Sequence, residues 1–292
     1  MNAKKIRLDV LLHQRGLFPS REAARRAVMA GLVKHEDEVF DKPGLQVRED
    51  ISLRVLQPLH PYVGRGGLKL EKALSVFPVN LTGRIVVDVG SSTGGFTDCA
   101  LQNGASHVYA VDVGYGQLAW KLRSDARVTV MERTNFRHVD EGVFRPRPSV
   151  AVMDVSFISA GLLFPKLLEI LEPPFDIISL VKPQFEAGRA DVGKGGIVRD
   201  LSVHKRVLRE HRAMGESNSL HLGGFTYSPV TGGDGNIEYL AWWQGVKSVD
   251  ETTSMFLAAT GPLVAGSDVD MVVEAAWNSL AEQGNGPPEA ES

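Results

Sequence analysis

Four charged residues lie next to the ends of predicted strands, where side chains can meet at one edge of an α/β sheet. Asp154 follows the apolar run 150–153, and Lys182 follows the apolar run 177–181. Lys69 precedes the first predicted strand of the sheet, and Glu238 opens the last. Each alone is more simply explained as a surface lysine, a helix-capping aspartate or an exposed glutamate. Ligands of open α/β sheets bind beyond the carboxyl ends of the strands, so we expect Asp154 and Lys182 to meet there.

A glycine-rich stretch follows the first of these strands. The β-branched run 85–87 leads to Asp88 and Val89, and Gly90, Gly94 and Gly95 precede a predicted helix from Phe96. Glycine lets the backbone turn with positive φ and approach a ligand closely. The spacing fits neither the dinucleotide fingerprint nor the phosphate loop. By itself it leaves two interpretations open, a cofactor-binding loop and a structural turn.

A regular alternation of strands and helices positions these residues. Strands are predicted at 84–89, 107–112, 128–131, 150–154 and 176–181, with helices at 159–171 and 200–216 among them. The segments 222–227 and 237–243 flank a Gly- and Asn-rich turn and indicate an antiparallel hairpin. Asp112 ends the second strand, 22 residues after Gly90, where an acid can bind a ribose diol. The pattern predicts an α/β fold whose ligand site lies along one sheet edge.

The first 60 residues predict a separate small α+β unit. Two short helices are expected within 6–15 and 20–30, followed by short strands near 32, 39, 45 and 51. Residues 1–34 carry eight Lys or Arg against two acids, whereas the whole chain has a net charge of −3. This basic segment indicates either a surface for a polyanion or a solvated helix face.

Composition excludes several classes of protein. The single cysteine, Cys99, excludes an internal disulfide framework and favours a reducing, cytoplasmic location. No apolar run reaches the roughly 18 residues that span a bilayer, so no membrane partner is expected. The ligand spacing of a zinc site is absent, and no metal is expected.

Motifs at 7–12, 16–17, 20–24 and 30–33 resemble the small RNA-binding domain named after a small-subunit ribosomal protein. In that family the basic face of the helix pair docks on structured RNA. The resemblance implies an RNA-binding set to which we add one arginine of the linker: Lys4, Lys5, Arg7, Arg21, Arg25, Arg26 and Arg65.

The βα repeat closed by an antiparallel pair resembles the Rossmann-like sheet of S-adenosylmethionine-dependent methyltransferases. That resemblance implies S-adenosyl-L-methionine as cofactor and a binding set of Asp88, Gly90, Ser91, Ser92, Thr93, Gly94, Gly95, Phe96 and Asp112. The order Lys69, Asp154, Lys182, Glu238 resembles the catalytic tetrad of FtsJ-like RNA ribose 2′-O-methyltransferases. Segments 64–70, 154–159, 182–188 and 192–199 resemble the hemolysin A (TlyA) family, which joins both domains and methylates cytidine ribose in 16S and 23S ribosomal RNA.

From these resemblances we expect an RNA-binding domain at 1–59, a linker at 60–66, a methyltransferase domain at 67–245 and a helical extension at 246–292. Lys182 is expected to act as general base in a monomeric enzyme whose partner is ribosomal RNA. A free lysine has a pKa near 10.4, which burial or a second cation lowers and carboxylates raise. Two alternatives are a non-catalytic ribosome- or RNA-binding protein and a hemolysin. The target nucleotide and the choice of ribosomal subunit are not encoded in any motif.

Overall fold

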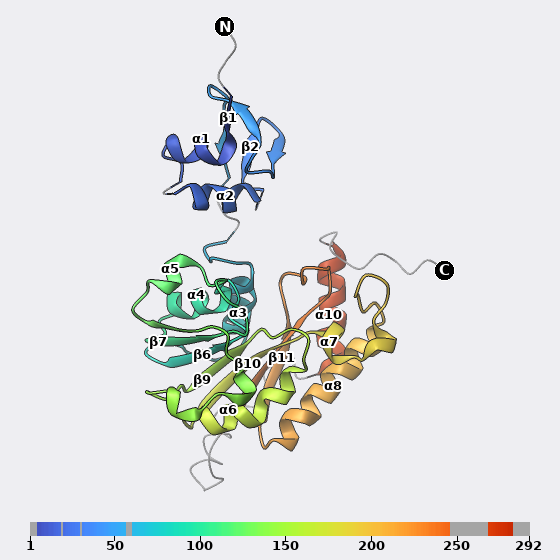
Figure 1. The fold of residues 1–292 in the computed structure, drawn as a ribbon. Helices are drawn as coiled ribbons and strands as arrows, with labels where there is room; N and C mark the ends of the chain where they lie inside the picture. Colours follow the sequence, from blue (N-terminus) through green and yellow to red (C-terminus); the bar gives the residue numbers. More distant parts are fainter. Residues whose placement is uncertain (1–4, 19, 30, 57–59, 246–267, 283–292) are drawn as a thin grey trace, which may run out of the picture. The chain divides into compact units, whose positions relative to one another are not determined.

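A computed structural model describes residues 5–18, 20–29, 31–56, 60–245 and 268–282 (Figure 1). The chain divides into two compact units, an N-terminal unit of residues 1–61 and a C-terminal unit of residues 62–292. Each unit has its own hydrophobic core. The predicted linker is partly folded, because Tyr62 is buried in the core of the C-terminal unit.

The N-terminal unit packs two helices on two small antiparallel sheets. Its elements are β1 (Lys5–Arg7), α1 (Leu8–Gln14), α2 (Arg21–Met29), β2 (Val33–His35), β3 (Glu38–Phe40), β4 (Gln46–Arg48) and β5 (Arg54–Val55). Strand β1 pairs with β4, and β2 lies between β3 and β5. The first helix starts two residues later than predicted, since Ile6 pairs with Val47 in a strand. Ser20 caps α2 as expected, with its Oγ accepting from Ala23 N at 3.1 Å.

The C-terminal unit is built on a seven-stranded sheet. Its strands are β6 (Ile85–Val89), β7 (His107–Val111), β8 (Val128–Met131), β9 (Val150–Met153), β10 (Phe175–Val181), β11 (His221–Tyr227) and β12 (Tyr239–Gly245). They are ordered β11-β12-β10-β9-β6-β7-β8, and β12 runs antiparallel to both of its neighbours. The predicted α/β fold and the antiparallel hairpin are confirmed.

Helices cover both faces of this sheet (Figure 1). They are α3 (Gly66–Val76), α4 (Gly95–Gln102), α5 (Trp120–Arg123), α6 (Phe164–Ile170), α7 (Pro183–Glu186), α8 (Leu201–Ser217) and α10 (Val269–Glu282), with 3-10 turns at Phe136–His138, Glu141–Val143, Ala160–Leu163 and Arg189–Asp191. Val86 packs with α3 and α4 in one core, while Val87 packs with α6 and α8 in the other. Strands buried on both faces explain the continuous apolar runs in the sequence.

The region after the hairpin is described only in part. Helix α10 lies against α8 and β11, and Lys205 of α8 pairs with Glu274 of α10 at 2.9 Å. The rest of the predicted extension, 246–267 and 283–292, lies outside the described residues.

Candidate active site

The candidate site lies where the strand order reverses. From β6 the chain runs outward to β7 and β8 on one side, and then returns to β9 on the other side of β6. The loops that leave β6 and β9 diverge at the carboxyl edge, which is where such sheets bind ligands. Because β12 is antiparallel, its amino end reaches this same edge and brings Glu238 to it.

The structure joins all four residues of the predicted tetrad in one chain of ion pairs. Lys69 Nζ of α3 lies 2.6 Å from Glu238 Oε2 and 3.7 Å from Asp154 Oδ2. Lys182 Nζ, just after β10, lies 2.5 Å from Asp154 Oδ1. Asp154 therefore bridges the two lysines.

The two lysines differ in their surroundings. Burial acts to lower the pKa of Lys69, but the charges of Asp154 and Glu238 outweigh it and raise this pKa above its usual value. Lys69 is thus held as a cation between two carboxylates. Lys182 has one carboxylate partner, and its Nζ also donates to Ser156 Oγ at 2.9 Å.

A polar pocket of about 310 Å³ opens beside these side chains. Three of its walls are α3 with the preceding residue Arg65, the glycine-rich loop, and the turn at 230–233. Its lining residues are Arg65, Gly66, Lys69, Gly90, Ser91, Ser92, Thr93, Gly95, Phe96, Asp154, Ser156, Lys182, Val230, Thr231, Gly232 and Gly233. Three members of the tetrad and most of the predicted loop residues therefore share one pocket.

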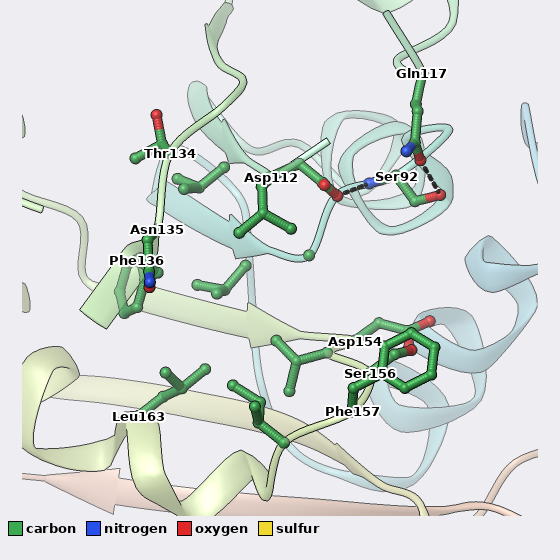
Figure 2. Close-up of a pocket in the computed structure, with 16 residues that line it drawn as sticks. Ser92, Asp112, Gln117, Thr134, Asn135, Phe136, Asp154, Ser156, Phe157 and Leu163 are labelled. Atoms are coloured by element: carbon green, nitrogen blue, oxygen red, sulfur yellow. Dashed lines mark hydrogen bonds between the residues drawn. The ribbon is translucent and has the colours of Figure 1, made fainter. Parts of the chain in front are cut away.

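An apolar pocket of about 300 Å³ adjoins the polar pocket (Figure 2). The two pockets share Gly90, Ser92, Asp154 and Ser156. Val89, Val111, Phe136, Ile158 and Leu163 give the apolar pocket its hydrophobic wall, and Asp112, Thr134 and Asn135 are among its polar groups. A flat apolar ring with polar substituents suits such a lining.

Two of the loop glycines have different roles. A Cβ on Gly90, which has φ of +84°, would lie 2.6 Å from the backbone oxygen of Asp154. A Cβ on Gly94, with φ of +96°, would lie 2.2 Å from Leu122 Cδ1. Gly90 thus lets the loop pass close to the tetrad, whereas Gly94 lets it pack on α5 and lines neither pocket.

The two acids of the predicted cofactor set are also placed differently. Asp112 borders the apolar pocket, where its oxygens accept from Ser92 N and Gly114 N, each at 2.7 Å. Figure 2 shows Asp112 and Ser92 bonded at the pocket rim. Asp88 is fully buried below the loop, where its Oδ2 accepts from Thr97 Oγ1 at 2.6 Å. Burial raises the pKa of Asp88 to about 7, and its Oδ1 lacks a hydrogen-bond partner among the described residues.

Three of the predicted RNA-binding residues, Arg7, Arg21 and Arg25, line one pocket of the N-terminal unit, and the rest of the described set does not line it. Arg7 and Arg21 both pair at 3.0 Å with the buried Asp9, whose pKa falls to about 2 chiefly through the hydrogen bond from Arg7. Arg25 lies 3.9 Å from Glu22. Lys5 and Arg26 are exposed, and Lys4 lies outside the described residues. Arg65 belongs to the C-terminal unit, in the polar pocket.

Sequence reasoning missed several residues that line the pockets. Thr134, Asn135 and Phe136 follow β8, and Ser156, Phe157 and Ile158 follow β9 beyond Asp154. The rule that ligands bind beyond strand ends applies to β8 as well and could have identified the first three. The other three required the path of the loop after β9.

Known proteins share this arrangement. The sequence matches FtsJ-like methyltransferases over residues 62–244, which is more than half of the chain. The chain belongs to the FtsJ-like methyltransferase family. Residues 6–50 match the S4 domain, so this FtsJ-like protein carries an S4 domain ahead of the methyltransferase domain.

Relatives of this FtsJ-like protein match along most of their length. A Bacillus subtilis protein named "Putative rRNA methyltransferase YqxC" is 50% identical over 99% of this chain and 100% of its own. The 16S/23S rRNA (cytidine-2′-O)-methyltransferase TlyA of Mycobacterium tuberculosis is 41% identical over 82% of this chain and 90% of its own. A solved structure described as "Putative hemolysin from Streptococcus thermophilus" is 44% identical, with a TM-score of 0.72 over 96% of this chain and 98% of that one. The resemblance to the TlyA family is confirmed.

Among the described residues, no cluster of three or more His, Cys, Asp or Glu side chains could hold a metal ion. In the same part of the chain, no helix is both long enough and apolar enough to cross a membrane.

Proposed function

We propose that this protein transfers a methyl group from S-adenosyl-L-methionine to the 2′-oxygen of cytidine ribose in 16S or 23S ribosomal RNA. The observation that carries this proposal is the continuous ion-pair chain Lys69–Glu238 and Lys69–Asp154–Lys182 beside a polar pocket. The relative TlyA is named for this reaction, and the S4 domain supports an RNA substrate.

The donor set of the two pockets fits S-adenosyl-L-methionine. An apolar slot suits adenine, the Asp112 carboxylate at its rim suits ribose hydroxyls, and the adjoining polar pocket suits an amino acid with a charged sulfur. S-Adenosyl-L-methionine supplies a methyl group on a positive sulfur that an oxygen nucleophile can take. In the proposed site Gly90, Ser92 and Asp112 bind this cofactor, while Asp88 and Thr97 hold the loop from below.

Lys182 acts as the general base in this proposal. A ribose hydroxyl is a weak nucleophile, so its proton must leave as the oxygen forms its bond to the methyl carbon. Lys69 is the poorer candidate because two carboxylates raise its pKa. Asp154 orients the Lys182 amine, and Lys69 with Glu238 fixes Asp154 from the other side. A positioned base contributes about 10²–10⁴-fold to the rate.

The test is methyl transfer to ribosomal subunits from cells that lack this gene, followed by mapping of 2′-O-methylated nucleotides. Lys182→Ala should lower kcat by about 10²-fold or more. Lys166→Ala, which removes an equivalent amine from α6, is the matched control and should retain kcat. Undiminished transfer by Lys182→Ala contradicts the assignment of the base. Binding without any transfer by the wild type would favour a non-catalytic RNA-binding protein.

The hemolysin description of the solved relative calls for one separate measurement. Purified protein should leave dye-filled phospholipid vesicles intact at concentrations that methylate ribosomal RNA. Dye release at those concentrations would make membrane lysis a second function.

A further inference from the structure

The amine of Lys182 has a second polar partner outside the predicted tetrad. Lys182 Nζ lies 2.5 Å from Asp154 Oδ1 and 2.9 Å from Ser156 Oγ, and the ring of Phe185 is centred 5.8 Å away. Asp154 and Ser156 are two residues apart in the loop after β9. One short segment therefore supplies both hydrogen-bond acceptors of this amine.

Two hydrogen-bond acceptors fix the orientation of the Lys182 amine, whereas one acceptor does not. A neutral amine has two N–H bonds and one lone pair, and a single hydrogen bond leaves it free to rotate about that bond. When Asp154 and Ser156 each accept one N–H, the lone pair has one remaining direction. We propose that Ser156 is a positioning residue that fixes the lone pair of Lys182 for proton removal. This inference rests on the function proposed above.

The proton balance is simple. The Lys182 nitrogen forms a new N–H bond as the ribose O–H bond breaks, and the oxygen electron pair forms the bond to the methyl carbon. The methyl–sulfur bond breaks at the same time, and its electron pair stays on the donor sulfur. Ser156 keeps its own proton throughout, because its oxygen only accepts from Lys182.

The segment that carries Ser156 is held in a strained conformation. Phe157, the next residue, has φ of +68°, a region that bulky residues rarely occupy, and the residue is 86% exposed. Glu186 of α7 anchors the far end of the segment, because its Oε1 accepts from Ala160 N at 3.0 Å. Helix α7 begins directly after Lys182. The helix that follows the proposed base therefore also holds the loop 154–160, which contains Ser156. Strain of this kind is retained where the surrounding structure requires it.

The position of Ser156 also agrees with this role. Ser156 lines both pockets, together with Gly90, Ser92 and Asp154. Figure 2 shows Ser156 beside Asp154 in the apolar pocket. It therefore stands at the junction where a bound methyl donor and an acceptor hydroxyl would meet. A serine at this junction can hold the base without occupying the polar pocket itself.

The first experiment compares three variants in methyl transfer to ribosomal subunits. Ser156→Ala should lower kcat about tenfold, equivalent to about 1.4 kcal/mol, with little change in KM for the subunits or in Kd for S-adenosyl-L-methionine. Ser156→Thr restores the hydroxyl and should recover most of kcat. Ser75→Ala removes an exposed hydroxyl that bonds to its own helix, and should match the wild type. An unchanged kcat for Ser156→Ala, or a loss confined to KM, overturns the proposal.

The second experiment tests whether Ser156 acts through Lys182. Adding Ser156→Ala to Lys182→Ala should cause no further loss, since the group that Ser156 positions is already gone. Multiplying losses would show that Ser156 acts independently, and would overturn the inference. Equal activity of Lys182→Ala and the wild type would instead refute Lys182 as base, so the two failures are distinguishable.

Discussion

The close approach of Gly90 to the tetrad makes Gly90→Ala an informative perturbation. Two penalties follow from the structure. Alanine at φ of +84° costs about 1–2 kcal/mol, because its Cβ crowds the following carbonyl oxygen. The same Cβ would lie 2.6 Å from the Asp154 oxygen, whereas ordinary contact begins at 3.4 Å, so the Asp154 backbone must move by about 0.8 Å (3.4 − 2.6).

A matched variant separates these two penalties. Gly83 lies in the turn before β6 with φ of +73°, and a Cβ there would have no atom within 4 Å. Gly83→Ala therefore carries the conformational penalty alone, at the opposite end of β6 from the site. Thermal melting of both variants should show a larger loss for Gly90→Ala, with the excess reporting the clash with Asp154.

Methyl transfer provides the decisive assay for this pair. A misplacement of about 1 Å in a catalytic constellation can cost 10²-fold in rate. We expect Gly90→Ala to lower kcat by about 10–100-fold and to weaken binding of S-adenosyl-L-methionine in calorimetry, while Gly83→Ala retains both. Equal kcat values for the two folded variants would refute the argument that Gly90 is needed for the position of Asp154.

Three more predictions follow from the charged groups. Glu238→Gln removes the negative charge that lies 2.6 Å from Lys69 Nζ. Lys69 then competes with Lys182 for Asp154, and kcat should fall about 10²-fold; an unchanged kcat contradicts this coupling. The pKa of Asp88 is about 7 in the folded chain, against about 3.9 when unfolded. This difference lowers the free energy of unfolding by on the order of 4 kcal/mol as pH rises between these two values. The melting-temperature difference between Asp88→Asn and the wild type should therefore increase in favour of the variant from pH 4 to pH 7 and then level off; a pH-independent difference contradicts the shift. Arg25→Ala with Arg26→Ala should weaken ribosomal RNA binding and reduce the slope of log affinity against log salt by about 2; an unaltered slope removes these arginines from the RNA contacts.

The sequence predicted the strands of the large sheet and the residues that lie at the strand ends. Doubly buried parallel strands read as apolar runs, so β6 to β10 were found within about two residues. The meeting of Asp154 and Lys182 was predicted because both residues follow strand ends, which converge in an α/β sheet, whereas the full set of four came from the resemblance to the FtsJ-like tetrad. The distances and roles of these groups were not available from spacing, since they depend on how α3 brings Lys69 to Glu238, 169 residues away in sequence.

The parts that escaped prediction depend on loops and on individual pairings. Ser156 could be identified only from the structure, because its 2.9 Å contact with Lys182 depends on the path of the loop after β9. Arg7 and Arg21 were assigned to RNA, and that assignment stays a prediction; their shared pairing with Asp9 was not predicted, because it joins residues with no periodic relation. Composition reveals the sign of such a surface, but not which of its charges already have partners.

The insertion of β12 between β10 and β11 has a consequence for how the protein becomes active during synthesis. Residues 62–227 contain all of the glycine-rich loop and three tetrad members, yet the position beside β10 stays open until β12 is made. Until then β11 has no partner in the sheet, and Lys69 lacks Glu238. A nascent chain halted before residue 238 would hold the glycine-rich loop but would lack Glu238, the partner of Lys69. If the proposed tetrad is catalytic, methylation would begin only after β12 has been inserted, so the order of translation would delay activity until the tetrad is complete.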